Sequence, residues 1–198
     1  MSATPKASKA LTRRKFLQTG MVTGFVRPST VLGQPPNRAR PKAGDWLVFD
    51  GGEKSGERIT PALLELDQRP VAALAKEPET ETLRDGSRLN RVMVTKLDLA
   101  RLDNATGDLT ADGVIAYSAV CTHTGCDVTN WDPDNLFMAC PCHESKFDVY
   151  NNAKVVGGPA PRPLAVLPLR LDGDAIVIAD IFQGRVGFTQ QFWRACEH

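Results

Sequence analysis

Two short stretches of this 198-residue chain hold nearly all of its cysteines and histidines. The first reads CTHTGC at 121–126, and the second reads CPCHESKFD at 140–148. Together they contain four of the five cysteines and two of the three histidines. Each stretch can place a thiolate and an imidazole at the tip of a loop, and these are ligands of zinc and of iron. The pattern therefore predicts a metal site.

The residue types alone leave two kinds of metal centre open. The available ligands are Cys121, His123, Cys126, Cys140, Cys142 and His143. Zinc accepts two thiolates and two imidazoles in a closed tetrahedral site. A [2Fe–2S] cluster accepts the same set, with both thiolates on one iron and both imidazoles on the other. Either choice leaves two cysteines over, which a zinc ribbon would use as ligands and an exported protein could pair as a disulfide.

The elements that must position these two boxes read as short strands. The strand-like runs are DWLVFD (45–50), RVMVTKLDL (91–99) and GVIAYSAV (113–120), the last of which leads directly into the first box. Two apolar runs around Asp172–Gly173 predict a hairpin. Residues 76–88 and 104–113 are polar and predict loops, whereas 59–66 and 70–75 fit a strand or a short helix equally well. Many short strands with frequent turn signals predict an all-β fold.

The two ends of the chain differ from this body. Residues 1–42 contain no Asp or Glu, and LTRRKFLQ (11–18) places Arg13 and Arg14 before a short apolar run. This resembles a twin-arginine export signal, so we expect residues 1–33 to be the signal and the protein to be periplasmic. The apolar run is shorter than the roughly 20 residues of a spanning helix, so any association with the inner membrane is expected to be peripheral. Residues 34–44 are Pro-rich and predict a linker, 45–190 the folded domain and 191–198 a tail.

The two boxes together resemble the cluster boxes of the Rieske iron–sulfur proteins. GGPAPRPL (157–164) is similar to their proline loop, and the resemblance covers about 113–170. It implies an antiparallel β-sandwich with an inserted cluster-binding subdomain. It implies that Cys121 and Cys140 hold one iron of a [2Fe–2S] cluster, that His123 and His143 hold the other, that Cys126 and Cys142 form a disulfide, and that Ser145 donates a hydrogen bond at the cluster.

Two residues depart from the pattern of the respiratory Rieske proteins. Phe147 stands where those proteins have a tyrosine that donates to a sulfur, and Glu144 stands where a glycine usually follows the second histidine. Loss of a hydrogen bond and gain of a carboxylate both disfavour an added electron. We therefore expect a lower potential than in a quinol-oxidising respiratory Rieske protein.

The resemblance implies an electron-transfer subunit with no catalytic site of its own. One interpretation is the small subunit of an exported oxidoreductase similar to arsenite oxidase, with a larger molybdenum-containing partner. The alternative, favoured by the proline loop, is the Rieske subunit of a quinol:cytochrome c oxidoreductase of the cytochrome bc type. Either would deliver electrons to a cytochrome c-like acceptor. The net charge of +1 gives no indication of nucleic-acid binding.

Overall fold

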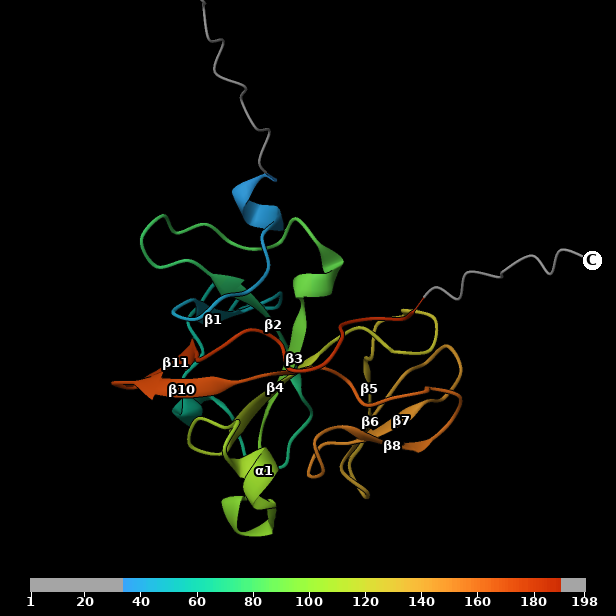
Figure 1. Ribbon diagram of the computed structural model, residues 1–198. Coiled ribbons are helices and arrows are strands. Elements are labelled where there is room, and N and C mark those ends of the chain that lie inside the picture. Colours follow the sequence, from blue (N-terminus) through green and yellow to red (C-terminus); the bar gives the residue numbers. More distant parts are fainter. Residues whose placement is uncertain (1–33, 190–198) are drawn as a thin grey trace, which may run out of the picture. The chain divides into compact units, whose positions relative to one another are not determined.

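The computed structural model describes residues 34–189, which form two antiparallel sheets and only short helical turns (Figure 1). The base sheet has seven strands in the order β10-β11-β1-β2-β3-β4-β9, and β10 also contacts β4, so the sheet is nearly closed. Its strands are β1 (Trp46–Phe49), β2 (Val71–Lys76), β3 (Val92–Lys96), β4 (Val114–Ser118), β9 (Val166–Leu167), β10 (Leu169–Asp172) and β11 (Ala175–Ile178).

The second sheet belongs to what we call the cluster lobe, residues 119–164. It has the order β5-β6-β7-β8. Its strands are β5 (Asn130–Asp132), β6 (Phe137–Ala139), β7 (Lys146–Asp148) and β8 (Lys154–Gly157). The lobe is inserted between β4 and β9, which pair with each other in the base sheet through Ala116 and Leu167. The predicted all-β fold with an inserted cluster-binding subdomain is confirmed.

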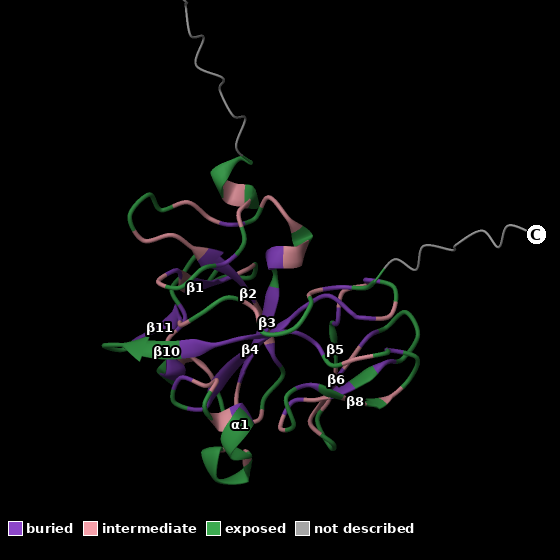
Figure 2. Cartoon of the chain, in the orientation of Figure 1, coloured by how far each residue is buried: buried purple, intermediate pink, exposed green. Residues whose placement is uncertain are grey.

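Strand β4 joins the two parts because both of its faces are buried (Figure 2). Successive side chains of a strand point to opposite faces. Val114 and Ala116 therefore pack in the base core, while Ile115 and Tyr117 pack in the core beneath the lobe. An unbroken apolar run such as GVIAYSAV is typical of a strand that is covered on both sides. This strand carries the chain from the base sheet into the first box.

The turns follow local chemistry. The hairpin predicted around Asp172–Gly173 is present, with Asp172 paired to Ala175 and Gly173 at a positive φ of 65°. Residues 59–66 contain a 3-10 turn, Pro61–Leu63, and an isolated bridge from Leu66 to Lys96, whereas 70–75 lies mostly in β2. The segment predicted as a loop at 104–113 contains one short helix, α1 (Asn104–Gly107), because the Asp103 carboxylate accepts a hydrogen bond from Thr106 N at 2.7 Å.

Residues 34–44, expected to be a linker, lie against the base. The 3-10 turn Pro36–Arg38 begins this segment, and Arg40 donates to the carbonyl of Leu89 at 2.8 Å. Gly44 N donates to Ile178 O at 2.9 Å. The compact unit thus begins at Gln34. The expected export signal and the tail with Cys196 lie outside the described residues, and within 34–189 no helix has the length and apolar character to cross a bilayer.

A buried ion pair fixes the start of the base sheet. Asp45 is fully buried and the Arg84 side chain is 3% exposed. The guanidinium donates twice to this carboxylate, from Nε at 2.5 Å and from Nη2 at 3.0 Å. The hydrogen bond from Arg84 to Asp45 holds the pKa of the guanidinium above its usual range. Two parallel N–H groups of a guanidinium match the two oxygens of a carboxylate in distance and in direction. This pair therefore determines how the segment before β1 packs against the 77–90 loop.

Candidate metal centre

The two boxes form loops with the same backbone pattern. In the first, Cys121 N donates to Cys126 O at 2.8 Å and Gly125 N donates to Cys121 O at 3.1 Å. In the second, Cys140 N donates to Ser145 O at 2.9 Å and Glu144 N donates to Cys140 O at 3.0 Å. Each loop therefore begins with a buried cysteine and folds back five residues later. The equivalent residues Gly125 and Glu144 both have positive φ, 83° and 57°.

The structure brings the four predicted ligands into one place. Cys121 and Cys140 are free cysteines, each 1% exposed, at the start of their loops. His123 is half-buried and His143 is exposed, and their ring centroids are 4.7 Å apart at an interplanar angle of 86°. The thiols thus form the inner half of the site and the imidazoles the outer half. The Nδ1 atom of His123 is buried and has no hydrogen-bond partner among residues 34–189.

The two remaining cysteines of the boxes are joined to each other. Cys126 and Cys142 form a disulfide with a Cα–Cα distance of 6.5 Å, which confirms the expected bridge. The Cys140 sulfur lies within 4.8 Å of both bridged sulfurs. Because the bridged cysteines have no thiolate to offer, they are excluded as metal ligands. The bridge fastens one ligand loop to the other directly beside the site.

The surroundings of Cys121 favour a protonated thiol in the absence of a metal. Burial raises the pKa of this thiol, and the neighbouring Cys140 sulfur raises it further. The backbone N–H of His123 and the hydroxyl of Ser145 act in the opposite direction by donating to the Cys121 sulfur. Ser145 Oγ also accepts from Ala160 N at 3.1 Å, which leaves the hydroxyl proton for the sulfur. Ser145 is buried beside Cys121, and its role at a cluster stays a prediction.

The proline loop closes over the boxes by direct backbone contact. Gly158 has a φ of 76°, and a Cβ there would lie 2.5 Å from Ser145 Cα. Only glycine permits this approach. On the other side, Thr122 Oγ1 donates to Arg162 O at 2.7 Å. Sequence reasoning missed Thr122 and Arg162, and no spacing in the chain marks them, because each acts through a contact 40 residues away.

Phe147 closes the inner side of the site. It is fully buried on β7, opposite Met138 of β6, and packs in the same core as Cys121 and Cys140. Its ring offers no donor to a sulfur. The position at which the resemblance leads one to expect a tyrosine thus carries an apolar side chain.

The donor set fits a [2Fe–2S] cluster of the mixed thiolate–imidazole type. Two buried thiols lie together, two imidazole rings pack edge to face, and one buried ring nitrogen lacks a partner among residues 34–189. Such a cluster, when bound, exchanges single electrons. Cys121, Cys140, His123 and His143 would hold such a cluster, with the Ser145 hydroxyl beside the Cys121 sulfur and loops over the inner half of the site.

Comparison with known proteins points to the same centre. The family model described as Rieske [2Fe-2S] domain matches residues 76–168. A protein of Haloferax mediterranei, provisionally named respiratory nitrate reductase subunit Rieske, is 47% identical over 76 residues, 38% of this chain and 34% of its own. The cytochrome bc1 complex Rieske iron-sulfur subunit of Corynebacterium efficiens is 43% identical over 65 residues, 33% of this chain and 16% of its own. The chain thus spans about a third or less of these two relatives.

Among the solved structures that match, one covers more of this chain than the two sequence relatives do. It is the plasma membrane Rieske protein PetC3 of Synechocystis PCC 6803, which is 26% identical. The match has a TM-score of 0.39 and covers 60% of this chain and 93% of the other.

Proposed function

Because this chain carries a Rieske [2Fe–2S] domain, we propose that it is an electron-transfer subunit whose cluster is held by Cys121, Cys140, His123 and His143. One observation supports this assignment above the others. Of the six possible ligands in the boxes, two are bridged to each other, which leaves two thiols and two imidazoles together. That is the ligand set of a Rieske cluster. The chain accepts one electron from a donor and passes it to a carrier.

Metal analysis tests this function. The purified protein is expected to contain about two irons and two acid-labile sulfides and no zinc. His143→Ala removes an outer ligand and is expected to abolish the cluster absorbance. The matched control is His198→Ala, which changes the histidine that lies outside both boxes. Stoichiometric zinc in a colourless protein, or an unaltered cluster in His143→Ala, would refute the assignment.

We also propose that residues 1–33 direct export of the folded protein to the periplasm, with any membrane association being peripheral. The support is the pair Arg13–Arg14 ahead of an apolar run in an acid-free segment. Replacing both arginines with lysine preserves the charge but removes the pair. The variant is expected to accumulate in the cytoplasm with its cluster intact, as judged by cell fractionation. Normal export of that variant would count against a twin-arginine signal.

For the assembly, we propose a small subunit that serves a larger exported redox enzyme of the arsenite-oxidase type. The support for this assembly is the presence of Phe147 and Glu144. Both are expected to lower the reduction potential of the cluster, and a low potential suits a partner that does not oxidise quinol. The second candidate is a cytochrome bc-type complex, favoured by the similarity to a bc1 subunit and by the proline loop. Co-purification from the native host distinguishes the two. Molybdenum in the purified complex supports the first, and b-type haem supports the second.

A further inference from the structure

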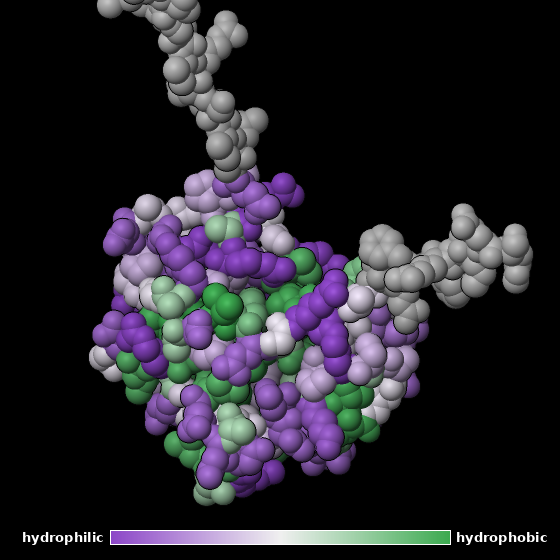
Figure 3. Space-filling view, in the orientation of Figure 1, coloured by the Kyte–Doolittle hydropathy of each residue, from purple (hydrophilic) through white to green (hydrophobic). Residues whose placement is uncertain are grey.

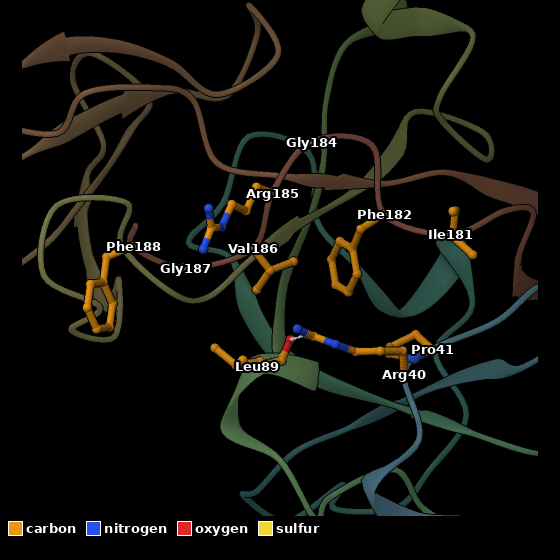
Figure 4. Close-up of a pocket in the computed structure, with 10 residues that line it drawn as sticks. All are labelled: Arg40, Pro41, Leu89, Ile181, Phe182, Gly184, Arg185, Val186, Gly187 and Phe188. Atoms are coloured by element: carbon orange, nitrogen blue, oxygen red, sulfur yellow. Dashed lines mark hydrogen bonds between the residues drawn. The ribbon is translucent and has the colours of Figure 1, made fainter. Parts of the chain in front are cut away.

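An open groove of about 500 Å³ lies outside the metal centre (Figure 4). Every residue of the segment 181–188 except Gln183 contributes to one wall of the groove. Arg40, Pro41 and Leu89 form the opposite wall. Ile181 is 66% exposed and Phe188 is 44% exposed, while Phe182 and Val186 are half-buried. The view in Figure 3 likewise shows apolar surface interspersed with hydrophilic side chains. Large apolar side chains gathered at an open groove are typical of an interaction site.

The groove also carries positive charge that is not paired with a carboxylate within residues 34–189. Arg40 and Arg185 are both exposed, and neither forms an ion pair with a carboxylate of residues 34–189. Arg38 lines an adjoining hollow that shares Arg40 and Leu89 with the groove. Burial, followed by the positive charge of Arg185, lowers the pKa of the neighbouring Arg162. The groove therefore combines an apolar wall with guanidinium groups that pair with no carboxylate of the described part of the chain.

Two contacts attach this groove to the loops of the metal centre. The Phe188 ring packs on Gly125 of the first box so closely that a Cβ at Gly125 would lie 2.6 Å from the ring. Arg162, in the proline loop, donates hydrogen bonds to the carbonyls of Arg185 and Gly187. A molecule bound in the groove would therefore lie next to both loops that surround the centre.

We propose that the groove docks an extended acidic segment of a partner protein that inserts a large apolar side chain. Carboxylates of the segment would pair with Arg40 and Arg185, and guanidinium–carboxylate pairs add orientation as well as attraction. The apolar side chain would cover Ile181 and Phe182. A second copy of this chain fits less well, because a two-fold contact would place the same arginines face to face. This docking site goes beyond the proposed electron transfer and does not depend on it.

Selection from a displayed library of random peptides of ~10 residues tests the proposal on the cluster-loaded protein. The enriched peptides are expected to combine Asp or Glu with Phe, Trp or Leu. Binding of a selected peptide should weaken about tenfold or more in Arg185→Glu and should fall as salt rises. Ile181→Ser should weaken it several-fold. Arg170→Glu, an exposed arginine on β10 whose side chain is 51% exposed, is the matched control and should bind normally.

Four results of the peptide selection would overturn the proposal, and dimerisation would be a fifth. They are no enrichment, enrichment of basic peptides, binding that is unchanged in Arg185→Glu, and binding seen only when the chain is shortened to end at Thr189. The last would assign the groove to residues 190–198. Dimerisation that depends on concentration and is lost in Ile181→Ser would instead assign it to a second copy. Cluster absorbance, recorded on every variant, separates these results from failure of the proposed function.

Discussion

The base sheet and the cluster lobe differ in where their stability comes from. Base strands reach six residues and enclose a core of their own, whereas no strand of the lobe exceeds four residues. The core of the lobe includes Met93, Ile115 and Tyr117, which belong to base strands. The lobe also depends on a disulfide and on a loop folded over the boxes. A metal centre can thus be presented at the surface on a small lobe, provided that a larger sheet and cross-links hold it.

Breaking the buried ion pair of the base should have the largest effect. Arg84→Met leaves the Asp45 carboxylate buried without its partner, which costs about 3–5 kcal/mol. Since the lobe rests on the base, both should unfold in one transition at lower urea, followed by far-UV circular dichroism. Arg170→Met, at an exposed arginine, is the control. A loss in Arg84→Met no larger than in this control would contradict the importance of the pair.

Removing the disulfide should affect the lobe alone. Cys126 and Cys142 are 16 residues apart, and a loop of this length contributes roughly 3 kcal/mol in the chain-entropy model. In the double serine variant the cluster should assemble but be lost more quickly. Amide hydrogen exchange should accelerate in β5–β8 and stay unchanged in β1–β3. Equal acceleration in both sheets would show that the lobe has no separate stability.

The hydroxyl of Tyr117 tests the contact between the two regions. It donates to Val149 O at 2.8 Å, and both residues are fully buried. Tyr117→Phe leaves that carbonyl without a donor, which costs about 1–3 kcal/mol. Denaturant unfolding measures the loss, and exchange should increase most around Val149. An unchanged unfolding free energy would mean that another group satisfies the carbonyl.

Adding a hydroxyl at Phe147 should change the potential but not the fold. A tyrosine there would donate to a ligand sulfur and stabilise the reduced cluster. A hydrogen bond that favours the reduced form by about 1 kcal/mol raises a one-electron potential by about 40 mV. Protein-film voltammetry measures this, with the cluster spectrum as the control. A potential that does not rise while the cluster is intact would show that the tyrosine contact has no counterpart here.

The smallest effect is expected from Tyr150, at the edge between the regions. Its hydroxyl donates to Asp67 and accepts from Asp98 N at 3.0 Å. Burial, followed by the hydrogen bond to Asp67, raises its pKa to about 12. The folded state therefore keeps this proton to a higher pH than the unfolded state does. The contribution of the Tyr150 hydroxyl to stability is complete below about pH 10 and is lost as the pH rises towards 12. Tyr150→Phe should be destabilised by about 1 kcal/mol at pH 8. It should also lose less stability than the parent between pH 10 and 12, as measured by urea unfolding.

The sequence by itself determined the chemistry of the centre and the local elements. The two boxes predict a metal site because ligand types at the tips of short loops are visible locally, whereas the four ligands and the cysteine pair were implied by the resemblance, of which the disulfide is confirmed. Strand β4 follows from an unbroken apolar run, and the hairpin at Gly173 follows from two apolar runs around a turn residue. The short helix at 104–107 was missed because its one cap, Asp103, lies in a segment with many loop-forming residues.

Only the tertiary structure decided which distant segments meet. The pairing of Asp45 with Arg84, the docking of residues 34–44 and the bond from Thr122 to Arg162 each join residues far apart in the chain. No periodicity specifies such partners, because a charge or a hydroxyl in the sequence does not indicate which group it will face. The groove beside the metal centre arises in the same way. Its arginines come from residues 40 and 185, which become neighbours only when the segment after β11 crosses the base.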